Sequence, residues 1–212
     1  MKRVAIIGAG VLGTHIAHYI LQDSHLRLAG FYDDYQEKGT VVNKGVVLGA
    51  INNIEFDFKK NVFDQLLIGV GYNHLYVRQK LFEKFTPNIP FATYVHPSAY
   101  VDSSVTLGEG VVVFPGCVLD KDVKVGNNVL FNIGCFIAHD SQVADNCFFG
   151  PGVVSAGFVS IGMHCFLGIN TSIINNIDIC DKVRTGGGTV VVSDIKEPGL
   201  YIGTPAKLLK TL

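Results

Sequence analysis

The chain has 212 residues, a formal net charge of −1, 48% hydrophobic residues and 24 glycines. This composition excludes a disordered chain and falls far short of the one-third glycine of collagen. The balanced charge excludes a basic nucleic-acid-binding surface, and no apolar run approaches the ~18 residues that span a bilayer. We therefore expect a cytoplasmic globular protein with five free cysteines, no nucleic-acid partner and no membrane insertion.

Strand and helix patterns alternate up to about residue 95. Residues 2–7 predict a buried strand, a glycine-rich segment follows it, and residues 14–21 predict a helix. Further strands are expected at 26–32, 66–70 and 91–95. A second helix is expected to end near residue 85, with the side chain of Asn73 as its cap. This order predicts a small parallel sheet, and hence an α/β Rossmann-like half-domain over residues 1–95.

A different pattern, with a period of six residues, begins after residue 95. All but one of the residues at one phase are apolar: Val101, Leu107, Val113, Leu119, Val125, Phe131, Ile137, Val143, Phe149, Ser155, Ile161, Leu167, Ile173 and Ile179. The residues four positions later are small or β-branched: Val105, Val111, Cys117, Val123, Val129, Cys135, Ser141, Cys147, Val153, Val159, Cys165, Thr171, Ile177 and Val183. This period fits neither an α-helix nor a hairpin and predicts a solenoid of short strands.

Three such strands close a triangular coil of 18 residues, and successive coils stack at the strand spacing of ~4.8 Å. Glycines and small residues recur every 18 residues where sharp corners are expected, for example Gly126 and Gly162. We therefore expect residues 96–212 to form a parallel β-helix followed by a C-terminal tail. Four cysteines fall on its inward positions, where packed free thiols are favoured over metal ligands or disulfides.

The chain resembles bacterial sugar O-/N-acyltransferases of the NeuD/PglD type. The matching stretches run through most of the sequence in the order of the family: Gly8-Ala9-Gly10 to Gly13, Phe31-Tyr32-Asp33-Asp34, Ile68-Gly69-Val70-Gly71-Tyr72-Asn73, Val95-His96-Pro97-Ser98, Ile137-Ala138-His139-Asp140, Ser155-Ala156-Gly157, Phe166-Leu167-Gly168-Ile169-Asn170, Gly186-Gly187-Gly188 and Gly203-Thr204-Pro205-Ala206-Lys207. The resemblance implies a left-handed β-helix (hexapeptide-repeat solenoid), a homotrimer, acetyl-CoA as co-substrate and no metal.

His139 is the candidate catalytic base. It follows inward Ile137 by two positions, so its side chain should leave the coil near a corner. Neutral imidazole can take the proton of an amine that attacks a thioester near pH 7. The resemblance implies that His139 is the proton acceptor and that Asp140 raises the basicity of its imidazole.

Gly157 lies 18 residues after His139 and should stack beside it in the next coil. Its backbone N–H could then meet the oxyanion of a tetrahedral intermediate, which is the role that the family places there. The resemblance further assigns Phe148, Gly157, Ile169 and Gly187 to the acetyl-CoA site. Phe148 stands where relatives that N-acetylate often carry histidine, and because phenylalanine donates no hydrogen bond, amine and hydroxyl acceptors both stay open.

The N-terminal half-domain carries a candidate phosphate-binding segment. Gly8, Gly10 and Gly13 have the G-x-G-x-x-G spacing between a strand and a helix, and Asp33 follows 20 residues later, as in a dinucleotide fold. About 95 residues are half of a full dinucleotide domain, so a nucleotide sugar is favoured over NAD. With the resemblance, the candidate nucleotide-sugar residues are Gly8, Gly10, Val11, Leu12, Gly13, Asp33, Asp34, Gly71 and Asn73.

The leading hypothesis is an acetyl-CoA-dependent N-acetyltransferase that acts on a nucleotide-linked amino sugar of the 4-amino-4,6-dideoxy type in surface glycan biosynthesis. An O-acetyltransferase of a sialic-acid-type sugar would use the same residues. A trimeric scaffold or nucleotide-sugar sensor is the non-enzyme alternative, and the intact set of His139, Asp140 and Gly157 argues against it.

Overall fold

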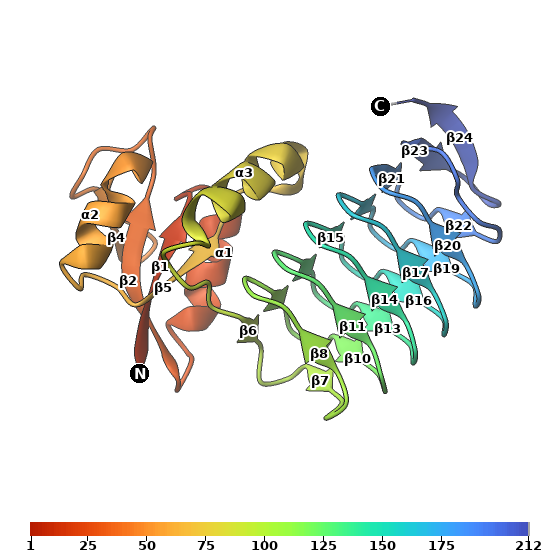
Figure 1. Ribbon diagram of the computed structural model, residues 1–212, viewed down its shortest axis with the longest axis horizontal. Helices are drawn as coiled ribbons and strands as arrows, with labels where there is room; N and C mark the ends of the chain where they lie inside the picture. Colours follow the sequence, from red (N-terminus) through yellow and green to blue (C-terminus); the bar gives the residue numbers. More distant parts are fainter. Residues whose placement is uncertain (212) are drawn as a thin grey trace. The chain divides into compact units, whose positions relative to one another are not determined.

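The structure is a computed structural model that describes residues 1–211 (Figure 1). The chain divides into two compact units, Met1–Thr93 and Tyr94–Leu212. None of the helices within residues 1–211 is long and apolar enough to cross a membrane.

The first unit is built around a five-stranded sheet with the order β3-β4-β2-β1-β5. Its elements are β1 (Lys2–Ile7), α1 (Val11–Ile20), β2 (Leu26–Tyr32), β3 (Val41–Val42), β4 (Gly45–Gly49), α2 (Ile54–Lys59), β5 (Gln65–Ile68) and α3 (Leu75–Phe85), with 3₁₀ turns at Ile51–Asn53 and Tyr72–His74. The strand β1 pairs in parallel with β2 and β5, and β2 pairs in parallel with β4. Central β1 is buried from Val4 to Ile7, as its continuous apolar run requires.

The strands predicted at 2–7 and 26–32 are confirmed, and the third is β5. The helix predicted at 14–21 begins earlier, because Gly10 already forms its N-cap and the N–H of Thr14 bonds to the Gly10 carbonyl at 2.9 Å. The strands β3 and β4 and the helix α2 are not predicted by the sequence pattern, because they lie in a segment without clear periodicity.

Two predictions at the end of this unit are wrong. The side chain of Asn73 does not cap α3, because a 3₁₀ turn intervenes and makes His74 the residue before the helix. Residues 91–95, predicted to be a strand, do not form one continuous strand of this sheet. Phe91 forms only an isolated bridge with Leu66, and Tyr94–Val95 is β6, which pairs with β9 of the second unit.

The second unit is a parallel β-helix with three faces, and its coils follow one another along the axis (Figure 1). Face 1 consists of β7 (Tyr100–Val101), β10 (Val118–Leu119), β13 (Phe136–Ile137), β16 (Val154–Ser155), β19 (Ser172–Ile173) and β22 (Val190–Val191). Face 2 consists of β8 (Thr106–Leu107), β11 (Lys124–Val125), β14 (Gln142–Val143), β17 (Ser160–Ile161) and β20 (Asp178–Ile179). Face 3 consists of β6 (Tyr94–Val95), β9 (Val112–Val113), β12 (Leu130–Phe131), β15 (Phe148–Phe149), β18 (Phe166–Leu167), β21 (Val183–Thr185), β23 (Gly199–Ile202) and β24 (Lys207–Lys210).

The 18-residue coil is confirmed by the pairing register. Leu119 pairs with Ile137, and Ile137 pairs with Ser155. Both inward columns form one buried core, and the four inward cysteines are fully buried free thiols. The core rings of Phe131 and Phe149, one coil apart, stack with their centroids 4.6 Å apart.

Short polar residues and glycine occupy many corners of the β-helix. Asn128, Asn146 and Asn170 have φ between 54° and 62°, a left-handed conformation that asparagine tolerates better than most residues. At other corners the coils approach so closely that side chains are excluded. A Cβ on Gly150 would lie 2.8 Å from the backbone nitrogen of Ile169 in the next coil.

Candidate active site

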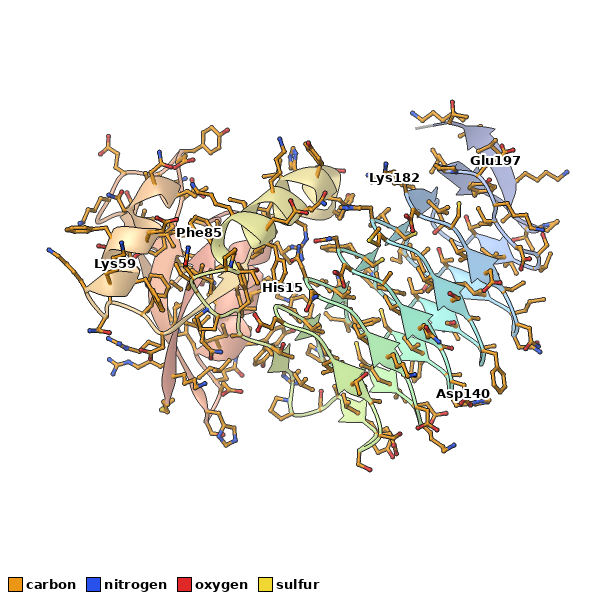
Figure 2. The ribbon with its side chains drawn as sticks, in the orientation of Figure 1. His15, Lys59, Phe85, Asp140, Lys182 and Glu197 are labelled. Carbon is orange, nitrogen blue, oxygen red and sulfur yellow. The ribbon has the colours of Figure 1, made fainter. Side chains whose placement is uncertain are left out.

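The candidate catalytic pair lies at a corner of the β-helix. His139 and Asp140 occupy the turn between β13 and β14, where faces 1 and 2 meet. Ile137 points into the core, whereas the side chain of His139 is 48% exposed. Figure 2 shows Asp140 on the outside of the stacked coils. The side chain of His139 therefore leaves the coil as predicted.

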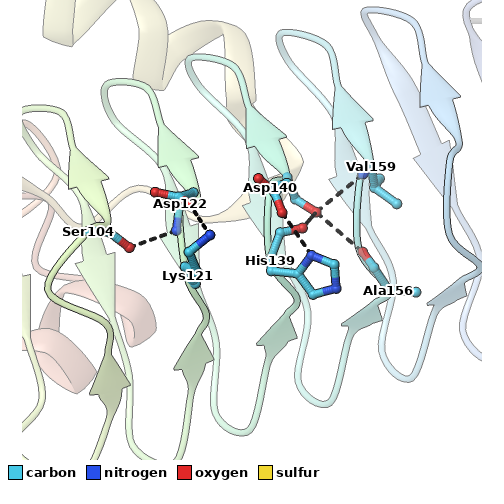
Figure 3. A network of polar contacts seen from close by, with 8 residues as sticks. Ser104, Lys121, Asp122, His139, Asp140, Ala156 and Val159 are labelled. Atoms are coloured by element: carbon cyan, nitrogen blue, oxygen red, sulfur yellow. Dashed lines mark hydrogen bonds and ion pairs between the residues drawn. The ribbon is translucent and has the colours of Figure 1, made fainter.

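Asp140 orients the imidazole of His139. Its Oδ2 lies 2.9 Å from Nδ1 of His139 (Figure 3). A neutral imidazole held by a carboxylate donates its Nδ1–H and keeps a lone pair on Nε2. That Nε2 hydrogen-bonds to no residue in the range 1–211, so the lone pair is available to an incoming proton.

Gly157 lies directly against this imidazole, one coil later. A Cβ at residue 157 would lie 2.7 Å from Cε1 and 2.8 Å from Nε2 of His139, so only glycine leaves room for the ring. The N–H of Gly157 donates to no acceptor within residues 1–211, whereas its carbonyl accepts from Asn176. The predicted stacking of His139 and Gly157 is thus present, with an available backbone donor beside the imidazole.

Ser141 ties these two coils together beneath the site. Its hydroxyl is buried, donates to the carbonyl of Ala156 at 3.3 Å and accepts from the N–H of Val159 at 3.2 Å (Figure 3). The sequence pattern predicts Ser141 only as a member of an inward column. A hydroxyl among apolar inward residues was the signal that could have indicated this link.

A lysine occupies the corner one coil before His139. Nζ of Lys121 lies 2.7 Å from Oδ2 of Asp122, and this hydrogen bond, together with the charges of Asp122 and Asp140, raises the pKa of Lys121. The lysine therefore stays an ammonium group, and the column of corners that includes His139 carries both carboxylate and cationic charge.

Of the four predicted cofactor residues, Gly157 lies against His139, and the other three lie elsewhere on the β-helix. Ile169 and Gly187 stack at the corner between faces 3 and 1, where a Cβ on Gly187 would lie 3.0 Å from Cγ2 of Ile169. Phe148 lies on the outward side of face 3, buried, with its ring centroid 6.1 Å from that of Phe166. The strands of face 1 separate Ile169 and Gly187 from the corner of His139, so one copy brings only Gly157 of the predicted cofactor residues to the catalytic pair.

The glycine-rich segment follows the carboxyl end of β1, where parallel sheets bind ligands. Gly8 has φ of 100°, and a Cβ on Gly13 would collide with the carbonyl of Gly8, so close packing demands both glycines. Gly10 is in an extended conformation with open space where a Cβ would be. Val11 is exposed and Leu12 is half-buried, both in the first turn of α1. This turn presents backbone N–H groups that an anion could accept.

Asp33 and Asp34 hold the loops at this edge. The carboxylate of Asp33 accepts from the N–H of Ala9 at 2.7 Å and from the N–H of Tyr35 at 2.8 Å. Oδ1 of Asp34 accepts from the N–H of Ile51 at 2.9 Å. Asp33 therefore holds the glycine-rich segment against the end of β2, a structural role that the sequence pattern does not predict.

Gly71 and Asn73 follow β5, the neighbour of β1, at the same edge of the sheet. Gly71 begins the 3₁₀ turn with open space where a Cβ would be, and Asn73 lies exposed within that turn. The candidate nucleotide residues therefore come from loops after three neighbouring strands. Within residues 1–211 no group of three or more His, Cys, Asp or Glu side chains could hold a metal ion.

Comparison with known proteins places this geometry in a family. The model of the PglD N-terminal domain matches residues 3–85. The curated UDP-N-acetylbacillosamine N-acetyltransferase of Bacillus subtilis (strain 168) is 36% identical over 115 residues, which are 53% of this chain and 51% of that protein. The aligned segment thus spans about half the length of that relative.

Solved structures match over almost the whole chain. PerB from Caulobacter crescentus, in complex with CoA and GDP-perosamine, is 31% identical with a TM-score of 0.90, and the match covers 99% of this chain and 98% of PerB. The chain belongs to the PglD-type family of sugar acetyltransferases. The acetyltransferase domain of PglB from Neisseria gonorrhoeae FA1090 is 25% identical, with a TM-score of 0.89 over 99% of this chain and 100% of that domain. The predicted family and the predicted fold, a Rossmann-like half-domain and a left-handed β-helix, are confirmed.

The close contact between Gly157 and His139 generates a prediction. We expect Gly157→Ala to push the imidazole away from its position over residue 157, because the added Cβ would lie 2.7 to 3.1 Å from three ring atoms. The turnover number should fall at least tenfold. The melting temperature should change little, since the exposed ring can move toward solvent. Steady-state kinetics and thermal unfolding measure the two effects, and parental turnover would show that the ring has room for a Cβ.

Proposed function

We propose that this PglD-type protein is an acetyl-CoA-dependent N-acetyltransferase of a nucleotide-linked amino sugar, of the 4-amino-4,6-dideoxy class. The observation that carries the proposal is the cluster of a carboxylate-oriented imidazole and an available backbone N–H on adjacent coils. Two relatives support the substrate class by their names, one acting on a UDP-linked and one binding a GDP-linked sugar. We assign residues 1–95 to the nucleotide sugar and residues 96–212 to acyl transfer.

The proposed reaction transfers the acetyl group directly. The sugar amine attacks the thioester carbonyl, and a C–N bond forms while the carbonyl oxygen becomes an oxyanion. Nε2 of His139 takes the amine proton. The C–S bond then breaks and the thiolate of CoA leaves, taking the proton back from His139 as the acetamide forms. A placed general base of this kind contributes roughly 10²–10⁴-fold in rate.

Gly157 supplies the proposed oxyanion donor. A backbone N–H held in place by the coil needs no reorganisation when charge develops, which is the physical basis of oxyanion stabilisation. Asp140 holds His139 in the tautomer that exposes the lone pair of Nε2. A structure of the GDP-perosamine N-acetyltransferase from Caulobacter crescentus, 30% identical to this chain with a TM-score of 0.92, was determined with a histidine replaced by alanine and holds CoA and GDP-perosamine.

The nucleotide is proposed to bind at the carboxyl edge of the first sheet. The first turn of α1, with Gly10 and Val11, would face the diphosphate, while Asp33, Asp34 and the loop at Gly71 and Asn73 would flank the nucleoside. The apolar side chain of Leu12 offers no hydrogen bond to the nucleotide. Since both oxygens of Asp33 already accept backbone N–H groups, its ribose contact would use its remaining lone pairs.

We further propose a homotrimer with the active site between copies. The outward residues of face 1 include Tyr100, Phe136 and Val154, which are apolar and exposed, whereas those of face 2 are polar, as at Lys124 and Gln142. His139 lies on one edge of face 1, and Ile169 and Gly187 lie on the other. A cyclic assembly can bring the first edge of one copy to the second edge of its neighbour, where Phe148, Ile169 and Gly187 would meet acetyl-CoA.

The cytoplasm is the proposed location. Both proposed substrates are metabolites of that compartment, and five free thiols within residues 1–211 suit its reducing conditions.

The experiment that tests the activity measures CoA release from acetyl-CoA with UDP-, GDP- and dTDP-linked 4-amino-4,6-dideoxy sugars and with their 4-hydroxy counterparts. We expect turnover with at least one amino sugar and none with the hydroxyl analogues. Under these conditions His139→Ala should lower kcat by 10²–10⁴-fold with little change in KM. Turnover only with hydroxyl sugars would favour the O-acetyltransferase, and undiminished turnover in His139→Ala would remove the proposed base.

The nucleotide site is tested by Gly10→Ala. We expect the variant to fold normally, because its extended backbone suits alanine and the added Cβ meets open space. The methyl group would occupy the approach to the first turn of α1, so affinity for the nucleotide sugar should fall about tenfold. Calorimetry should show unchanged binding of CoA, and unchanged binding of the nucleotide sugar would contradict the site. Asp33→Ala is a poorer test, since it also releases the clamp on Ala9.

The trimer is tested by sedimentation. The parent protein should sediment at about three times 22.9 kDa. Phe136→Asp places a charge on exposed face 1 and should yield a folded monomer without acetyltransferase activity. Gln142→Asp adds the same charge at the adjacent outward position of face 2 and should leave the trimer intact. An active monomer would contradict both the assembly and the shared site.

A further inference from the structure

An aromatic residue, Phe158, occupies a corner where the equivalent residues of the other coils are short and polar. Asp122, Asp140, Phe158 and Asn176 are 18 residues apart at the same corner, and their φ angles are 58°, 57°, 57° and 58°. Aspartate and asparagine are enriched in this left-handed region, whereas a bulky aromatic residue there is an outlier. The backbone of Phe158 is thus strained relative to its counterparts, and the strain occurs beside Gly157 and His139.

The ring of Phe158 contacts the candidate base. Its centroid lies 5.2 Å from that of the His139 imidazole, and the two planes are at 89°, an edge-to-face arrangement. The N–H of Phe158 donates to the carbonyl of His139 at 3.1 Å, so the backbones of the two residues are also joined. Phe158 is 55% exposed and belongs to no described core cluster, so core packing does not account for an aromatic residue here.

Three groups surround the imidazole of His139. Asp140 holds Nδ1 at 2.9 Å, Gly157 leaves the space in which the ring lies, and Phe158 stands against it edge to face. Asp140 by itself fixes one atom of a ring that can still swing about its side-chain bonds. The aromatic ring removes that freedom on one side and leaves Nε2 open toward an incoming amine.

We propose that Phe158 is a positioning residue for the acetyl transfer, which holds the imidazole of His139 in the orientation that directs Nε2 to the acceptor amine. The inference rests on the proposed function of His139, and it assigns to Phe158 a role that neither the sequence pattern nor the pairing of His139 with Asp140 supplies. On this proposal, the backbone strain at Phe158 is retained because the aromatic ring orders the imidazole of His139.

The test replaces the ring with the residue type that the corner prefers. Phe158→Asn should keep or raise the melting temperature, because asparagine relieves the strain. It should lower kcat about tenfold, measured with acetyl-CoA and GDP-perosamine or its UDP- and dTDP-linked counterparts, while KM for both substrates stays within twofold. Phe158→Tyr retains the ring and should restore at least half of the parental kcat.

The chain offers a matched control at Lys182, another non-asparagine residue with φ of 59°, on the corner between faces 2 and 3 (Figure 2). Lys182→Asn relieves the same backbone strain away from His139, and should leave kcat unchanged. An equal loss of kcat in Lys182→Asn, or in Phe158→Tyr, would overturn the proposal, since neither removes the ring from His139.

A spectroscopic readout without substrate separates this inference from the proposed function. Long-range ¹H–¹⁵N spectra of the imidazole, with His139→Ala identifying the signal, should show the Nδ1–H tautomer in the parent and a mixture of tautomers in Phe158→Asn. Parental tautomer and parental kcat in Phe158→Asn would overturn the positioning role. If His139→Ala retains turnover, the proposed function of His139 fails, and the tautomer measurement still decides whether Phe158 orders the ring.

Discussion

Parallel pairing of each strand with the strand 18 residues later is the constraint on which the second unit depends. The register that joins Leu119 to Ile137 and Ile137 to Ser155 translates every corner onto the corner of the next coil. Backbone hydrogen bonds across that step hold the corners as well, as between Phe158 and His139. The neighbours of a residue outside the core are therefore its counterparts one coil away. Gly157 lies against His139 for this reason.

Close approach of backbones is the second constraint, and it operates in both units. In the β-helix, the absence of a side chain at Gly157 makes space for an imidazole, and at Gly150 it makes space for the next coil. In the first unit, Gly13 in the first turn of α1 packs against the carbonyl of Gly8, where a Cβ would collide. Both candidate sites thus occur where a missing side chain permits a close approach to the backbone.

The three faces of the β-helix carry different chemistry, although their inward residues are alike. Face 2 presents polar side chains such as Lys124 and Gln142, whereas face 1 presents apolar ones such as Phe136 and Val154. The corner of His139 borders the apolar face. In the proposed trimer this face would be covered, and the resulting low-dielectric wall would strengthen the stabilisation of the proposed oxyanion relative to water.

The six-residue period determined the β-helix from the sequence alone, because an inward side chain in every short strand is the only way that such a chain buries its apolar residues. The same arithmetic predicted that His139 and Gly157 would be neighbours, since both lie on one column. Three features needed the tertiary structure. Asn73 lies where local pattern favours a helix cap, but a 3₁₀ turn between β5 and α3 displaces the helix start. The two backbone hydrogen bonds that the carboxylate of Asp33 accepts depend on how β1 and β2 pair. The contact of Phe158 with His139 depends on the direction of a side chain at a strained corner. Periodicity specifies which backbone positions meet, whereas the directions of exposed side chains follow from contacts that exist only in the folded chain.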